Sequence, residues 1–144
     1  MYRDGVADTE TLYKKYGKDI EFIVIYTLEA HPCGVNSPYT NKEWTMEASW
    51  DAAGNPLEQP QSYAERLAMA RQCVQELGIS PTVLIDEMDN SVWCAYGSAP
   101  NNAYLIGTDG KILAKHGWYQ PAGMELSITG FLKKQSRTPL LSTN

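Results

Sequence analysis

Residues 20–34 read IEFIVIYTLEAHPCG, and this stretch decides the fold. Its first part, 20–28, is β-branched, aromatic and almost continuously apolar, which is typical of a strand covered on both faces of a sheet. The run then stops at an acid, a histidine and a cysteine, namely Glu29, His31 and Cys33. The sequence therefore predicts a buried strand that ends either in a redox or proton-transfer site or in polar groups that simply face water.

Hydrophobic periodicity predicts helices and further strands around this one. Helices are expected at 8–17, 61–77 and 124–133, with a short helix or turn at 90–97. Strands are expected at 82–86, 103–107 and 111–116, and the turn residues TDG join the last two as a hairpin. Between them, residues 32–60 hold four prolines and two glycines, so we expect one long irregular excursion.

This order of elements predicts an α/β fold with a mixed four-stranded sheet flanked by helices. It is the order of the thioredoxin-like fold with its first strand missing. In that case the 20–28 strand must pair directly with the 82–86 strand or leave a gap. We expect a single domain over residues 1–134, followed by a frayed tail over residues 135–144.

Composition excludes several classes of protein. The net charge is −5, which argues against partners that present a phosphate backbone or an anionic membrane surface. No apolar run approaches the roughly 20 residues that cross a bilayer, and no signal-peptide pattern is visible. The sequence therefore predicts a cytoplasmic protein that binds neither nucleic acid nor membrane.

The spacing of the cysteines does not indicate a set of disulfide bonds. Cys33, Cys73 and Cys94 are odd in number and widely spaced, and no C-x-x-C or zinc spacing occurs. We therefore expect neither a disulfide scaffold nor a metal site. Cys73 falls near the apolar stripe of the 61–77 helix and is expected in the core.

Three segments resemble the iodothyronine deiodinases, selenoenzymes of thioredoxin-like fold. The segment KKYGKDIEFIVIYTLEAHP resembles that family's KYxxDxxFxxxYxxEAHP, and SYAERLAMA is similar to its SLEDRxxxA. VLIDEMDN followed by AYGSAPNNAYLI resembles VVDTMxN…AYGAxxxRLYVI. The resemblance runs from about Lys14 to about Leu132.

The resemblance implies catalytic roles for Tyr26, Glu29 and His31, which match the proton-relay positions of YxxEAH. Physical chemistry agrees, because histidine exchanges protons near its ordinary pKa of ~6.5 and Glu29 could orient the ring or raise its proton affinity. Asp86, the acid of DxMxN, and Asn102 fall at implied substrate-binding positions. The alternative for Asp86 is a cap on the following turn.

The chain departs from the animal pattern at two matched positions. Pro60 stands where a second histidine is implied, and Asn102 stands where an arginine is implied. Arginine grips a carboxylate bidentately and an amide does not, so we expect thyroid hormone not to be the preferred substrate. The resemblance also places the selenocysteine or cysteine nucleophile upstream of Met1. We therefore expect the natural protein to extend through a first strand and this nucleophile, and the 144-residue chain alone to be inactive.

Two cysteines of this chain are candidate redox thiols, namely Cys33 beside His31 and Cys94 between aromatic residues. Loop and packing roles are the alternatives for them. Aromatic residues near the second half of the chain could line a pocket for a phenolic ring or pack in the core: Trp93, Tyr96, Trp118 and Tyr119.

The leading interpretation is a deiodinase-like oxidoreductase domain that acts on a small substrate, with an external thiol reductant as co-substrate and no other cofactor. A thiol peroxidase or thioredoxin-like reductase is the second interpretation. The third is a redox-fold remnant that binds a partner without catalysis. A homodimer is left open.

Overall fold

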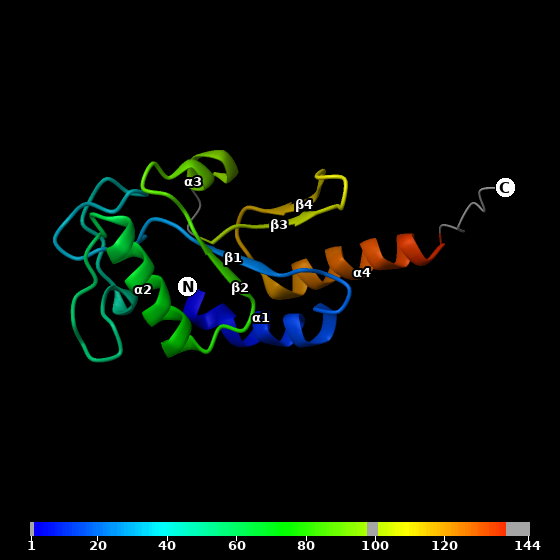
Figure 1. Cartoon of the computed structure of the whole chain (residues 1–144), viewed down its shortest axis with the longest axis horizontal. Helices are drawn as coiled ribbons and strands as arrows, with labels where there is room; N and C mark the ends of the chain where they lie inside the picture. Colours follow the sequence, from blue (N-terminus) through cyan, green and yellow to red (C-terminus); the bar gives the residue numbers. More distant parts are fainter. Residues whose placement is uncertain (1, 98–100, 138–144) are drawn as a thin grey trace. The chain divides into compact units, whose positions relative to one another are not determined.

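The computed structural model describes residues 2–97 and 101–137 and divides the chain into two units, residues 1–100 and 101–144 (Figure 1). Among the described residues, no helix has the length and apolar character needed to cross a membrane.

Unit 1 is built on a pair of parallel strands. Strand β1, Ile23–Tyr26, pairs with β2, Thr82–Ile85, in the register Ile23↔Thr82 to Tyr26↔Ile85. The ladder continues one residue further, because the Asp86 N–H donates to the Tyr26 carbonyl at 2.9 Å. The direct pairing of the two segments, one of the two expected outcomes, is therefore the observed one.

Helix α2, Tyr63–Leu77, covers one face of this pair. The Ser62 hydroxyl accepts from the Glu65 N–H at its start, and Gly78 ends it in the left-handed conformation at φ 64°. Its apolar side meets Val24, Val83 and Ile85, which point to the same face of the strands.

The opposite face of β1 and β2 is not covered as expected. Ile23, Ile25 and Leu84 are 53%, 38% and 48% exposed. The prediction of a strand buried on both faces is thus wrong for this structure. Alternate side chains of a strand point to opposite faces, and α2 covers only the face of Val24.

Helix α1, Tyr2–Tyr16, opens unit 1 and is longer than the expected 8–17 segment. It buries Val6, Leu12 and Tyr16, which recur along one side of the helix. A short helix, α3 at Ser91–Tyr96, follows β2 where a helix or turn is expected.

The excursion between β1 and α2 is irregular apart from a single 3-10 turn, η1 at Glu47–Ser49, and one bridge between Trp50 and Pro56. It lies beside α2 (Figure 1), where Gln72 Nε2 donates to Asp51 Oδ2 at 3.2 Å. Within it, the fully buried Ser49 accepts from the Leu57 N–H, so the excursion has its own hydrogen-bonded structure.

Unit 2 is a hairpin packed on a helix. Strand β3, Ala103–Ile106, pairs antiparallel with β4, Ile112–His116, and α4, Pro121–Arg137, packs on both strands. Leu105, Met124 and Ile128 form its buried centre, and His116 Nε2 lies 3.1 Å from Ser127 Oγ of α4. The last helix is longer than the expected 124–133 segment and includes residues 135–137 of the expected tail; residues 138–144 lie outside the described part.

The strands do not join into one sheet. In the described residues, β1 and β2 form one two-stranded sheet and β3 and β4 form another. The prediction of a single four-stranded sheet is therefore not confirmed. Short β1 and β3 segments of four residues each pair on one side only, and no described strand bridges them.

Candidate functional site

A cavity of about 220 Å³ lies in unit 1 between the end of β1 and helix α2. Tyr26, Glu29 and His31 line it on the strand side, so the structure brings the three expected catalytic residues to one cavity. Apolar and sulfur-containing side chains line the helix side: Met69, Ala70, Cys73, Val74 and Leu77. The site therefore combines proton-transfer groups with a largely apolar wall.

Tyr26 and Glu29 are in direct contact. The Tyr26 hydroxyl donates a hydrogen bond to Glu29 Oε1, and both residues are half-buried. A three-residue separation places two side chains on opposite faces of a straight strand. The contact forms because β1 ends at Tyr26 and the chain bends over the residues that follow.

The backbone of Glu29 is held from the far end of the excursion. The Glu29 N–H donates to Gln59 Oε1 at 3.0 Å, and Gln59 Nε2 donates to the Glu29 carbonyl at 3.2 Å. The amide side chain of Gln59 therefore satisfies both the N–H and the carbonyl of Glu29.

His31 is buried, with 6% of its surface exposed, and neither ring nitrogen has a hydrogen-bond partner within the described residues. Trp44 of the excursion packs edge-on against the ring, with centroids 4.2 Å apart and planes at 88°. Burial disfavours the imidazolium and lowers the pKa of His31 below 6.5, although the nearby Trp44 backbone partly opposes this.

The expected pairing of Glu29 with His31 does not form. Neither nitrogen of His31 bonds to the carboxylate, and the pKa of the ring is lowered instead of raised. The physical reason is that Glu29 faces Tyr26 while the imidazole packs against Trp44.

Asp86 lies at the N-terminus of α3. Its carboxylate oxygens accept from the N–H groups of Val92 at 3.0 Å and Trp93 at 2.9 Å, and the residue is 1% exposed. Asn90 occupies the N-cap position without a side-chain cap bond, so the Asp86 carboxylate serves as acceptor for two N–H groups of the first turn, as a capping side chain would. A contact of Asp86 with substrate remains a prediction.

Arg66, a residue that sequence reasoning did not single out, fixes the same turn from α2. It is 1% exposed and donates to the carbonyls of Asp86 and Glu87 and to Asn90 Oδ1 at 3.0, 2.6 and 2.8 Å. The arginine of the SYAER segment thus ties α2 to the turn before α3.

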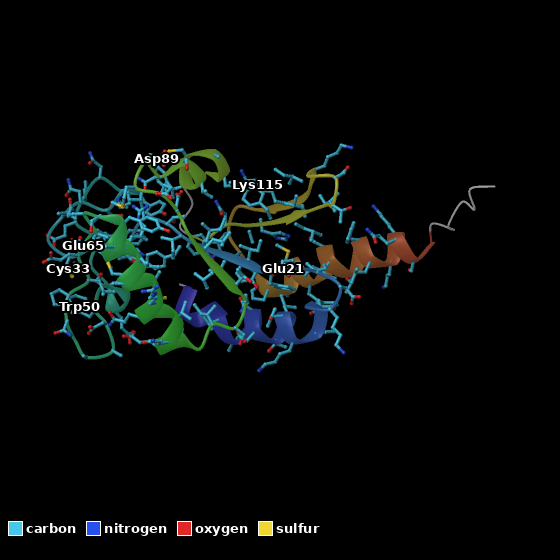
Figure 2. The ribbon with its side chains drawn as sticks, in the orientation of Figure 1. Glu21, Cys33, Trp50, Glu65, Asp89 and Lys115 are labelled. Carbon is cyan, nitrogen blue, oxygen red and sulfur yellow. The ribbon has the colours of Figure 1, made fainter. Side chains whose placement is uncertain are left out.

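The thiols occupy three different settings, and none of them is in a disulfide. Cys33 is half-buried in the excursion, and its Sγ donates to the Ser49 carbonyl at 3.3 Å (labelled with Trp50 in Figure 2). Cys94 is exposed on α3. Cys73, expected in the core, instead lines the cavity with His31. A redox role for Cys33 or Cys94 remains a prediction.

The other expected ligand-contacting residues are divided between the two units. Asn102 belongs to unit 2, where it immediately precedes β3. Trp93 packs against Tyr39, with its Nε1 3.0 Å from the Tyr39 hydroxyl, and neither ring lines the cavity. Within residues 2–97 and 101–137, no three metal-ligating side chains come close enough together to hold an ion.

Comparison with known proteins adds an independent finding. Residues 6–129 match the family described as iodothyronine deiodinase. Curated relatives include the thyroxine 5-deiodinases of Ovis aries and Bos taurus, each 29% identical over 99 residues, or 67% of this chain. The aligned region covers 29% and 28% of those proteins, so the chain spans less than a third of the curated relatives it matches.

Proposed function

The chain belongs to the iodothyronine deiodinase family. From that premise we propose that it is a deiodinase-like oxidoreductase domain in which Tyr26, Glu29 and His31 donate and accept protons during the reaction. The observation that carries the proposal is the cavity of unit 1, which gathers these three residues. Their contacts supply a hydroxyl donor, a carboxylate acceptor and a buried imidazole at one place.

The proposed reaction is the reductive removal of iodine from a small aromatic substrate. A selenolate or thiolate attacks the iodine, so that a selenium–iodine or sulfur–iodine bond forms as the carbon–iodine bond breaks. The electron pair stays on the ring carbon, which is reduced and takes up one proton. Two external thiols then reduce the selenenyl or sulfenyl iodide, giving a disulfide, iodide and the regenerated nucleophile.

The residues of the cavity fit the proton step. An imidazolium with a lowered pKa is a stronger acid than a solvated one, so His31 would release its proton readily to the carbanionic ring carbon. The Tyr26–Glu29 pair would carry the next proton towards it. Relays of this kind accelerate reactions by roughly 10²–10⁴-fold.

The proposal leaves the nucleophile to be supplied to the site, and this makes it testable with the chain as it stands. An aryl selenol and dithiothreitol are mixed with the 144-residue chain and an iodinated phenol, and iodide release is measured. We expect a rate above that of the selenol alone, reduced roughly 10²-fold or more in His31→Gln.

The matched control is His116→Gln, the same substitution at a histidine of β4 in unit 2, which should leave the rate unchanged. Equal rates for wild type and His31→Gln would contradict the relay. Rapid loss of hydrogen peroxide without iodide release would favour the thiol peroxidase interpretation.

A phenol without a carboxylate should react at least as well as its carboxylate-bearing analogue, because Asn102 offers no cation at the implied arginine position.

A further inference from the structure

The Gln59 side chain makes an unusual pair of contacts, because both of its hydrogen bonds go to one residue. Its Oε1 accepts from the Glu29 N–H and its Nε2 donates to the Glu29 carbonyl, at 3.0 and 3.2 Å. Only one orientation of the amide satisfies both bonds, since the N–H must meet the oxygen and the carbonyl must meet the NH₂. Gln59 is half-buried and the residue that follows it, Pro60, is buried.

This pairing replaces a strand neighbour. The ladder between β1 and β2 ends with the bond from the Asp86 N–H to the Tyr26 carbonyl, three residues before Glu29. Beyond that point the polar backbone groups need partners that the sheet does not give, because buried unpaired groups are costly. Gln59, which lies 30 positions further along the chain, supplies the hydrogen-bond partners of the Glu29 N–H and carbonyl.

The pairing also determines where the Glu29 carboxylate lies. The carboxylate meets the Tyr26 hydroxyl only while the chain bends back after β1. The two bonds from Gln59 fix the N–H and the carbonyl of Glu29, and therefore the direction in which its Cβ leaves the backbone. Gln59 can therefore act on the Tyr26–Glu29 contact through its two hydrogen bonds to the Glu29 backbone.

We infer that Gln59 is a positioning residue, which holds the Glu29 carboxylate against the Tyr26 hydroxyl and so sets the proton-transfer geometry of the site. This inference rests on the proposed function for its chemical meaning. The geometric part can be tested without any substrate.

The first test compares Gln59→Leu with wild type in the 144-residue chain labelled with ¹³C at the tyrosine Cζ. The Cζ resonance of a tyrosine reports the hydrogen bond of its hydroxyl, and Tyr26→Phe assigns the signal. We expect the Tyr26 resonance in Gln59→Leu to move towards that of an exposed tyrosine such as Tyr63. The Glu29 amide should also exchange with solvent at least 10-fold faster.

The matched control is Gln75→Leu, the same substitution at an exposed position of α2, which should leave both measurements unchanged. If Gln59→Leu does not fold, Gln59→Glu serves in its place. A carboxylate accepts from the Glu29 N–H but cannot donate to its carbonyl, so the amide should stay protected while the Tyr26 resonance shifts by a smaller amount. An unchanged Tyr26 resonance in a folded Gln59 variant would overturn the inference.

The second test separates this inference from the proposed function. In the selenol assay, Gln59→Leu should lower kcat about 10-fold or more and leave KM unchanged, since misplaced catalytic groups slow the chemical step without removing a substrate contact. A raised KM with unchanged kcat would overturn the inference. If wild type shows no turnover, the proposed function fails, and the two NMR measurements still decide the role of Gln59.

Discussion

His31 is buried against Trp44 with neither ring nitrogen bonded in the described part of the chain, and this environment makes stability depend on pH. Its pKa is lowered in the folded state, whereas the unfolded chain titrates near ~6.5. Between these two values the unfolded state binds more protons. The contribution of His31 to stability is therefore fully present above pH ~6.5 and is lost as the pH falls towards the folded-state pKa.

We expect urea unfolding to show a lower midpoint at pH 5.5 than at pH 7.5, and we expect His31→Gln to lose part of this difference because glutamine does not titrate. Identical pH dependence in wild type and His31→Gln would show that burial of His31 is not its source.

A second prediction concerns the tryptophan that covers the ring. Trp44→Ala removes the edge-on contact and opens His31 to water, so the imidazolium regains hydration. We expect the pKa of His31 to rise towards its ordinary value, as followed by the ring resonances in an NMR titration. Trp118→Ala, which removes a half-exposed tryptophan of unit 2, should leave that pKa unchanged.

At the scale of single residues, the sequence predicted the strand-end residues that line the cavity but not the loop residues that contact them. The acid and histidine after an apolar run indicated the strand end, and Tyr26, Glu29 and His31 do line one cavity. Trp44 and Gln59 were missed because nothing in an irregular segment shows which of its side chains turn inward. Periodicity gives that direction in helices and strands but not in such loops.

Among the elements, α3 donates two hydrogen bonds from its first turn to one buried carboxylate, that of Asp86. Asp86 accepts from Val92 and Trp93 in a buried setting, so Asp86→Ala leaves two N–H groups without their acceptor. We expect a loss of about 2 kcal/mol in the free energy of unfolding, measured with urea, within the range for caps and buried unsatisfied groups.

Asp89→Ala provides the comparison in the same turn. The Asp89 side chain is exposed and, among the described residues, accepts from the Ser91 N–H alone. Water can replace this bond, so the loss should stay below about 0.5 kcal/mol. Similar losses in the two variants would mean that the buried cap does not stabilise α3.

The elements themselves were largely predictable, and their ends less so. The Ser62 cap and the Gly78 stop lie next to the expected ends of the 61–77 helix, and both are encoded by local chemistry. The 20–28 strand, in contrast, shortens to Ile23–Tyr26. Apolar residues alone do not mark where a strand ends, and here the chain after Tyr26 makes the contacts of Glu29 with Tyr26 and Gln59 instead of continuing the ladder.

At the scale of the whole molecule, the α/β fold class is confirmed and agrees with the thioredoxin-like fold of the iodothyronine deiodinase family. The predicted assembly of all four strands into one sheet is not confirmed, because the described strands form two separate pairs. Element order predicts which strands exist, whereas the neighbours of each strand depend on contacts between distant segments. Among the described residues, β1 pairs with β2 and β3 pairs with β4. The single-domain boundary at 134 stays a prediction.

The contact between Gln59 and Glu29 spans 30 positions, and this spacing has a consequence for the order of events during folding. Local structure such as α2 forms quickly, whereas a contact across a long loop must first overcome the entropy of closing it. We therefore expect the contact between Gln59 and Glu29, and with it the proposed geometry of the Tyr26–Glu29 pair, to form at a late, native-like stage of folding. A chain that has already gained its helices but has not closed this loop would contain every residue of the proposed site without the arrangement that the proposal requires.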